Sequence, residues 1–276
     1  EKKPLFHFLP GSRSYSMATV GCNFRCTFCQ NADISQMPTD HHRIWGQDFL
    51  PESLVAEAAV SRAATIAYTY TEPTVYFELA LDTARLAVRQ GMRNVFVSNG
   101  YMTRECLETM NPDLHAANVD LKAFTDRFYK EQCGARLEPV LRTIESLKEL
   151  GVWVEVTTLL IPGLNDDPGE LRDIAGFIAG VDPGIPWHIS RFHPTYRLTD
   201  IGPTPSGTIH RAREIGLEAG LQYVYSGNLP GDEGENTLCH ACGRPLIDRF
   251  GFVVRKNRIQ DNKCPHCGAA VPGVWS

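Results

Sequence analysis

Short apolar segments alternate with amphipathic segments between residues 51 and 225. Apolar runs such as 94–98 predict buried strands, and in 138–150 the spacing of Val140 and Ile144 predicts one apolar helix face. Consecutive strand–helix units favour parallel pairing. About six units are too few for a closed eight-stranded barrel. We therefore expect an α/β fold built as a partial (β/α)6 barrel, with a doubly wound sheet as the alternative.

Three cysteines follow the first predicted strand, residues 16–20, in a CxxxCxxC spacing: Cys22, Cys26 and Cys29. Thiolates suit iron–sulfur clusters, which normally take four cysteines. Three thiolates on a short loop would hold three irons of a cubane cluster and leave one iron open to a reacting ligand. The spacing therefore favours a 4Fe–4S cluster.

Two other interpretations of these cysteines remain open. One is a zinc site completed by His41 or His42, and the other is a set of unrelated buried thiols. Structural zinc loops usually pair their cysteines as CxxC, and zinc does not require the aromatic Phe28 between the last two cysteines. Both histidines fall in residues 32–50, which show no clear period and are predicted as a loop.

The stretch GCNFRCTFCQN, residues 21–31, resembles the signature of radical S-adenosylmethionine (SAM) enzymes, and its final Gln-Asn is similar to their activating-enzyme branch. The resemblance implies a 4Fe–4S cluster whose open iron is chelated by the amino and carboxylate groups of SAM. It also implies an enzyme in which the reduced cluster cleaves SAM to methionine and a 5′-deoxyadenosyl radical, which abstracts hydrogen from a substrate. The cofactor carries this chemistry, and the protein supplies position and a dry cavity.

Ligands of parallel α/β folds gather at the carboxyl ends of the strands, and the resemblance implies SAM contacts there. Glu72 stands at the acid of a Gly-Gly-Glu element that binds the methionyl amino group, although bulkier residues replace both glycines. Ser98 and Asn99 match a Thr-Asn-Gly element, but Val97 stands where a relative has an acid. The candidate cofactor contacts are Phe28, Glu72, Ser98, Asn99, Asp120, Lys122, Thr157 and His193.

Simpler interpretations exist for several of these residues. Glu72 could begin a helix and Asn99 could belong to an ordinary turn. Asp120 and Lys122 could form a surface ion pair, although their spacing on a strand directs both to one face. Thr157 replaces an arginine of the activating enzyme, and His193 could be an ordinary loop histidine.

The C-terminal tail carries a second set of cysteines. After a Gly-, Asp- and Glu-rich linker, residues 227–236, two CxxCG motifs supply Cys239, Cys242, Cys264 and Cys267. Paired CxxC motifs predict a zinc ribbon, and an auxiliary iron–sulfur cluster is the alternative. So short a segment needs a metal to fold. We expect a barrel domain over residues 1–226 and a metal ribbon over residues 227–276.

Composition limits the partners and the cellular compartment that we expect for the chain. With 43% hydrophobic residues, 276 residues can build a large core. The net charge of −5 argues against a nucleic-acid backbone as the main partner. No apolar run reaches the roughly 18 residues of a membrane span, so no membrane association is expected. Seven of the nine cysteines have metal-type spacing, which favours a reducing cytoplasm over a disulfide scaffold.

The segment KKPLFHFLPG before the cluster motif, the element YTEPT and the ending CGAAVPGVW together resemble the AmmeMemoRadiSam family. Members carry a further N-terminal segment with cysteines, so we expect an N-terminal truncation, as the initial Glu-Lys-Lys also indicates. The family name implies Memo-like and AMMECR-like partners, and the chemistry implies an electron donor such as flavodoxin or ferredoxin. The resemblance to the pyruvate formate-lyase activating enzyme covers the barrel motifs but not the ribbon.

Three functions are compatible with these features. The first is radical SAM chemistry on a peptide or protein, as in activating enzymes. The second is the same chemistry on a small molecule. The third is a non-catalytic zinc-ribbon scaffold.

Overall fold

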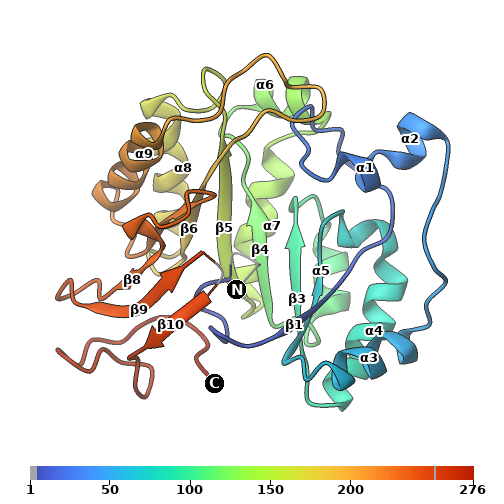
Figure 1. The fold of residues 1–276 in the computed structure, drawn as a ribbon, viewed down its shortest axis with the longest axis horizontal. Helices are drawn as coiled ribbons and strands as arrows, with labels where there is room; N and C mark the ends of the chain where they lie inside the picture. The colour runs from blue at the N-terminus through green and yellow to red at the C-terminus, as the bar shows by residue number, and fades with distance from the viewer. Residues whose placement is uncertain (1–4, 252) are drawn as a thin grey trace.

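The computed structural model describes residues 5–251 and 253–276, so residues 1–4 of the expected barrel domain lie outside the described part. Within that part, one parallel sheet and one antiparallel sheet form (Figure 1). The seven strands of the parallel sheet are β1 (Ser14–Met17), β2 (Thr65–Tyr68), β3 (Arg93–Ser98), β4 (Ala116–Asp120), β5 (Trp153–Leu160), β6 (Trp187–Arg191) and β7 (Val224–Gly227).

The strands of the parallel sheet follow one another in chain order, from β1 to β7. Met17 of β1 pairs with Tyr68 of β2, and Asp120 of β4 pairs with Thr157 of β5. A doubly wound sheet reverses its order at a switch point. The sequential order excludes that alternative and confirms the predicted α/β architecture, with all carboxyl ends at one edge.

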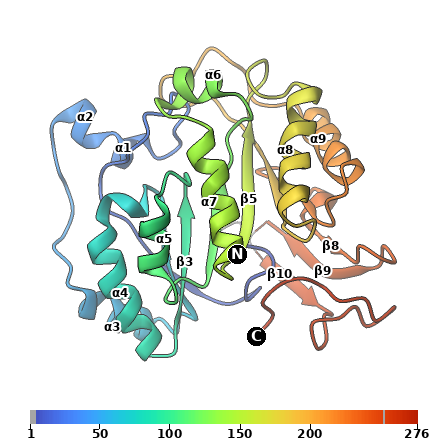
Figure 2. The same cartoon turned by 180° about the vertical axis from the view of Figure 1, so that it is seen from behind.

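Helices cover one face of this sheet, as the view from behind shows (Figure 2). In α7 the buried side chains include Val140, Ile144 and Leu147, which face the sheet side of an otherwise polar helix. The helices are α1 (Ala32–Ser35), α2 (Met37–His41), α3 (Pro51–Val60), α4 (Phe77–Arg89), α5 (Arg104–Met110), α6 (Asp126–Phe128), α7 (Glu138–Glu149), α8 (Pro168–Val181) and α9 (Ser206–Glu218).

Two terminal segments pack on the sheet away from the main helical core. Leu5 and Phe8 form a buried cluster with Val95 and Ala116, and Val274 packs against that cluster. The backbone N–H of Leu9 donates to the carbonyl of Val274 at 2.7 Å. The N-terminal stretch and the C-terminal tail therefore cover the sheet together, at the end opposite the strands' carboxyl ends.

A buried glutamate anchors the N-terminal stretch. Glu155 accepts hydrogen bonds from the backbone N–H groups of Phe6 at 2.9 Å and His7 at 2.8 Å, and its Oε2 lies 2.6 Å from Nε2 of His188. Burial opposes ionisation of Glu155, but the bond to His188 and the nearby imidazoles outweigh it and hold its pKa below the ordinary value. A buried carboxylate with these partners ties residues 6 and 7 to β5 and β6.

The same polar network reaches the C-terminal segment. Nδ1 of His7 lies 2.6 Å from the carbonyl of Pro272, and Nε2 lies 2.6 Å from the hydroxyl of Tyr225. Arg249 donates to the Phe6 carbonyl at 2.9 Å and lies 4.2 Å above the Phe6 ring. The Tyr225 hydroxyl of β7 also lies 2.8 Å from the Thr237 hydroxyl, so the C-terminal segment is hydrogen-bonded to both the parallel sheet and the N-terminal stretch.

The antiparallel sheet has the order β10–β9–β8. Its strands are β8 (Thr237–Leu238), β9 (Pro245–Phe250) and β10 (Val253–Asn257). Phe6 and Tyr225 pack with Leu246 and Ile247 in a second buried cluster, which joins this sheet to β7. Among the helices of the described chain, none combines the length and apolarity needed to cross a membrane.

Candidate functional site

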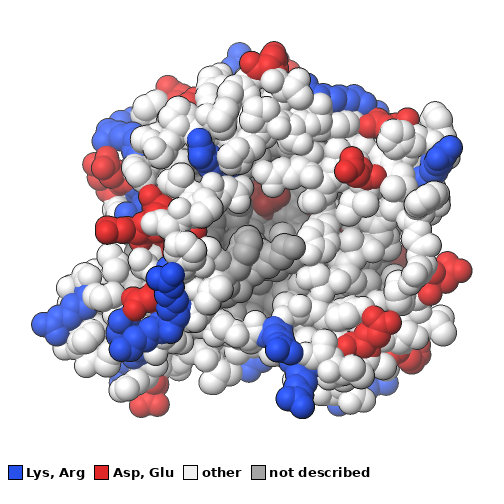
Figure 3. Space-filling view, in the orientation of Figure 1, with Lys and Arg blue, Asp and Glu red and all other residues white. Residues whose placement is uncertain are grey.

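A cavity of about 310 Å³ lies at the carboxyl ends of the parallel strands. Figure 3 shows that the corresponding face of the molecule is hollowed, with charged side chains of both signs around it. All three cysteines of the first motif line the cavity, together with side chains at or just beyond the ends of β2, β3 and β4 and side chains in the C-terminal half of β5. The cavity therefore lies at the edge where parallel α/β folds gather their ligands.

Neighbouring segments hold the loop that carries Cys22, Cys26 and Cys29. The N–H of Gly21, whose φ is +99°, donates to the carbonyl of Ile34 at 3.0 Å, and a positive φ suits glycine. The N–H groups of Arg25 and Thr27 donate to the carbonyls of Cys133 and Gln132, both at 2.9 Å. Backbone hydrogen bonds therefore hold the loop on both sides.

The three thiols suit a polynuclear cluster better than a single metal ion. A tetrahedral zinc with sulfur bonds of about 2.3 Å brings its sulfurs within about 4 Å of one another. Among the described residues, the group of ligand atoms that all lie within 4.8 Å of one another is the C-terminal one, without these thiols. His41 and His42 are exposed and do not line the cavity. The single-zinc interpretation therefore finds no support here.

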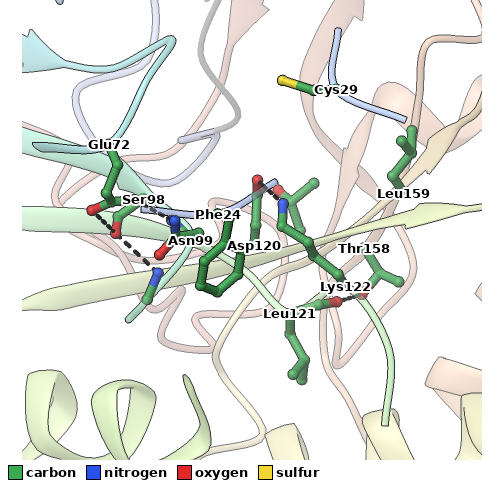
Figure 4. Close-up of polar contacts among 12 residues, drawn as sticks. Phe24, Cys29, Glu72, Ser98, Asn99, Asp120, Leu121, Lys122, Thr158 and Leu159 are labelled. Atoms are coloured by element: carbon green, nitrogen blue, oxygen red, sulfur yellow. Dashed lines mark hydrogen bonds and ion pairs between the residues drawn. The ribbon is translucent and has the colours of Figure 1, made fainter. Parts of the chain in front are cut away.

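Glu72 connects the ends of β2 and β3. Its Oε1 accepts a hydrogen bond from the Ser98 hydroxyl and its Oε2 accepts one from the Asn99 N–H, both at 2.8 Å (Figure 4). The side chain is 1% exposed. Burial raises the pKa of Glu72 to about 7, although these hydrogen bonds favour the ionised form. The carboxylate is thus poised to change its charge near neutral pH.

Asn99 links this carboxylate to the cysteine loop. Its side-chain amide donates to Oδ1 of Asn23 at 2.7 Å and approaches the sulfur of Cys22 at 3.8 Å. The polar groups on two strand ends and the first cysteine therefore form one connected unit.

Asp120 is the last residue of β4 and Lys122 follows it by two residues, and their side chains meet, as their spacing predicted. The Lys122 ammonium lies 2.8 Å from Oδ2 of Asp120 (Figure 4). It also lies 5.9 Å from the centroid of the Phe28 ring. Burial alone would lower the pKa of Lys122, but the Asp120 carboxylate together with the nearby Cys26 and Cys133 outweighs burial and raises the pKa well above the ordinary value. This ammonium therefore stays charged inside the cavity.

Of two other predicted cofactor contacts, Thr157 and His193, one lies in the cavity and one does not. Thr157 lines the cavity and donates its hydroxyl to Oδ1 of Asn118 at 2.8 Å. His193 lies two residues beyond the end of β6 at Arg191, is exposed and does not line the cavity. The structure therefore does not bring His193 to the site.

Sequence reasoning missed several cavity residues. Ser190 and Asn228 line the cavity from the ends of β6 and β7. Because ligands of parallel α/β folds gather at the carboxyl ends of the strands, both residues could have been identified from the sequence. Asn23, inside the cysteine motif, binds Asn99. No spacing rule in the sequence signals that contact.

The four C-terminal cysteines form a compact group. Their sulfur atoms all lie within 4.8 Å of one another, with Cys239 and Cys267 at 3.6 Å and Cys242 and Cys264 at 3.8 Å. These distances match the edges of a sulfur tetrahedron around one metal ion with bonds of about 2.3 Å. The group can therefore hold a metal, and its geometry differs from that of the first cysteine loop.

Comparison with known proteins agrees with this site. A family model described as the radical SAM superfamily matches residues 17–175. The chain is 46% identical over 274 residues to "Uncharacterized protein MJ0808" of Methanocaldococcus jannaschii, covering 98% of this chain and 81% of that protein. It is 23% identical to "Putative glycyl-radical enzyme activating enzyme MJ1632" of the same organism, over 75% of this chain and 78% of that protein.

Solved structures show the same fold. The crystal structure of Streptococcus suis SuiB bound to S-adenosylmethionine gives a TM-score of 0.62 at 12% identity, over 80% of this chain and 51% of that one. The family match spans more than half of the chain and includes the cysteine loop and the ends of β2 to β5. The chain belongs to the radical SAM superfamily.

Proposed function

We propose that the chain is a radical SAM enzyme that abstracts hydrogen from a peptide or protein substrate. The observation that carries the proposal is the connected unit of the cysteine loop, Asn99 and Glu72 in one cavity. When bound, a 4Fe–4S cluster and SAM supply one-electron cleavage of SAM to methionine and a 5′-deoxyadenosyl radical. The three cavity thiols fit that cluster, since no fourth cysteine among the described residues lines the cavity.

The side chains of the cavity have distinct parts in this proposal. Cys22, Cys26 and Cys29 hold the cluster as thiolates. The ionised Glu72 accepts hydrogen bonds from the methionyl ammonium, which compensates the cost of burying its charge. Lys122 supplies a fixed positive charge, and Phe28 excludes water beside it.

The preference for a peptide or protein substrate rests on similarity to an activating enzyme, which acts on another enzyme as its name states. Within the AmmeMemoRadiSam family, Memo-like or AMMECR-like proteins are the candidate partners, and a flavodoxin or ferredoxin is the candidate electron donor. The C-terminal cysteines would hold structural zinc, as the sulfur–sulfur distances of 3.6 and 3.8 Å favour.

Deuterium transfer tests this proposal. The anaerobically reconstituted protein is mixed with SAM, dithionite and a Memo-like or AMMECR-like protein grown in deuterated medium. We expect the partner to stimulate formation of 5′-deoxyadenosine and that product to carry deuterium. Stimulation only by low-molecular-mass extract would instead identify a small-molecule substrate. A fully loaded cluster that never yields 5′-deoxyadenosine would favour the scaffold function.

A further inference from the structure

A buried serine hydroxyl contacts the third cysteine of the loop. The oxygen of Ser35 lies 3.2 Å from the sulfur of Cys29, and both residues line the cavity. Among the described residues this is the shortest polar contact with a thiol of the loop, since the N–H of Phe24 approaches the sulfur of Cys22 at 3.4 Å. Ser35 is 3% exposed, so water competes little for its hydroxyl.

A neighbouring amide sets the direction of this hydrogen bond. The side-chain nitrogen of Gln36 lies 3.0 Å from the Phe24 carbonyl and 3.4 Å from the Ser35 oxygen. Because a carbonyl only accepts, the Gln36 group beside it is the NH2, which only donates. The Ser35 oxygen therefore accepts from Gln36, and its own hydrogen is left to donate to Cys29. A thiolate carries no hydrogen, so a metal-bound Cys29 accepts that bond in the same direction.

The backbone holds Ser35 in this position. The N–H of Ser35, the last residue of α1, donates to the Asn31 carbonyl at 2.9 Å. The Ile34 carbonyl accepts from the N–H of Gly21 at 3.0 Å, which joins α1 to the start of the cysteine loop. A serine hydroxyl in a helix commonly bonds the carbonyl one turn earlier or points to solvent. Here the hydroxyl contacts a cysteine sulfur instead.

We propose that Ser35 donates a hydrogen bond to the Cys29 thiolate of the loaded cluster and thereby raises the reduction potential of the cluster. Reduction adds one electron from a donor of the flavodoxin or ferredoxin type, and no bond forms or breaks in this step. The added negative charge spreads over the cluster and its thiolates, so a donor on a cluster sulfur stabilises the reduced form more than the oxidised form. The inference rests on the proposed function, because it requires a cluster on the three thiols. Ser35 acts through Cys29 and is a positioning residue.

The test measures the midpoint potential of the reconstituted cluster without SAM, by electron paramagnetic resonance of samples poised at a series of potentials. Ser35→Ala removes the donor. We expect the equilibrium constant for one-electron reduction to fall about tenfold, which makes the potential about 59 mV more negative. Ser35→Thr keeps a hydroxyl at this position and should have the potential of the unmodified protein.

Thr71→Val is the matched control for the loss of a buried hydroxyl. Thr71 is 9% exposed and lines the same cavity, but its hydroxyl donates to the Thr19 carbonyl at 2.9 Å. This variant should leave the potential unchanged. Equal shifts in Thr71→Val and Ser35→Ala would assign the effect to the polarity of the cavity and overturn the inference. An unchanged potential in Ser35→Ala would also overturn it.

Gln36→Leu gives an independent measurement. It retains Ser35 but removes the amide that orients the hydroxyl, so we expect a smaller shift in the same direction. If Ser35→Ala assembles no cluster, an unchanged potential in Gln36→Leu overturns the inference. A protein that shows the expected shifts and leaves SAM intact would contradict the proposed function alone. Failure of the unmodified protein to assemble any cluster would overturn the proposed function itself.

Discussion

The backbone N–H of Asn99 donates a 2.8 Å hydrogen bond to Oε2 of Glu72, across the ends of β3 and β2. Asn99 also contacts Asn23 and the sulfur of Cys22 through its side-chain amide. A buried acid, whose pKa burial raises to about 7, is therefore connected through Asn99 to Cys22, which the proposed function assigns to the cluster. We therefore expect the charge of Glu72 to affect how tightly the cavity binds SAM.

SAM affinity should depend on pH through Glu72. An ammonium group binds the ionised carboxylate, so below pH 7 binding must first remove a proton from Glu72. We expect affinity to fall about tenfold for each pH unit below about 7, and to level off above it. Calorimetric titration of the reconstituted protein with SAM between pH 5.5 and 8.5 (about three units) measures this. Glu72→Gln should bind weakly and without this pH dependence; a sloping profile in that variant would assign the titration elsewhere.

His7 should make the apoprotein less stable in acid. Burial lowers the pKa of His7 from 6.5 to about 4, so the unfolded chain takes up a proton before the folded chain does. The contribution of His7 to the free energy of unfolding is complete above pH 6.5. It decreases as the pH falls towards 4, by about 3 kcal/mol in total. Urea unfolding of the unmodified protein and of His7→Gln at a series of pH values measures the difference.

Glu72 has the opposite effect on the stability of the protein over nearly the same pH range. Because its pKa rises from 4.5 to about 7, the folded state loses stability as the pH increases through that range. The two effects offset each other in the unmodified protein, so the comparison with His7→Gln is decisive. If the stability difference between those two proteins stays constant from pH 7 to pH 4.5, the assignment to His7 is wrong.

The cysteine loop should be needed for the cluster, whereas other cysteines should not. Cys26→Ala removes one of the three thiolates, so we expect loss of the cluster and its visible absorbance after reconstitution. Cys106→Ala is the control, because Cys106 is half-buried on α5 and does not line the cavity. Iron and sulfide analysis of both variants gives the result. Equal cluster content in both would contradict the assignment.

The C-terminal cysteines should bind a separate metal. Cys264→Ser removes one of four sulfurs, so we expect loss of zinc and unfolding of residues 237–276, with cluster absorbance largely retained. Metal analysis and hydrogen exchange of the anaerobic protein measure the two effects. Loss of half the iron with this substitution would show that the C-terminal group is an auxiliary cluster instead.

The order of the strands and the place of the cavity could be predicted from the sequence. Apolar runs and helical periodicity predict β3 and α7. The carboxyl ends of parallel strands meet at one edge of the sheet, which brings Glu72, Asn99 and Lys122 to one cavity. These inferences depend only on local patterns and on the geometry of parallel sheets.

Other features depend on contacts that no local pattern reveals. Residues 32–50 were expected to be a loop, yet α1 and α2 form there, too short to show a period. The short helix α6 is followed by a π-helical turn, Tyr129–Cys133, and the carbonyls of Gln132 and Cys133 in this turn accept hydrogen bonds from the cysteine loop. The positive φ of Tyr70 has no signal in its residue type.

The buried network around Glu155 is also a long-range feature. Glu155 binds Phe6 and His7, which are almost 150 positions away in sequence. An acid in a predicted strand gives no indication of such partners. Only the packed structure shows that Glu155 binds the N-terminal stretch, and that His7 of this stretch in turn contacts Pro272 of the C-terminal tail.

Formation of 5′-deoxyadenosine tests the central claim most directly. The protein is reconstituted without oxygen with iron and sulfide, reduced with dithionite and given SAM, with Cys26→Ala treated in parallel. We predict 5′-deoxyadenosine and methionine in equal amounts from the unmodified protein and none from the variant. A preparation whose three cavity cysteines bind zinc, or a loaded cluster that leaves SAM intact, would contradict the account.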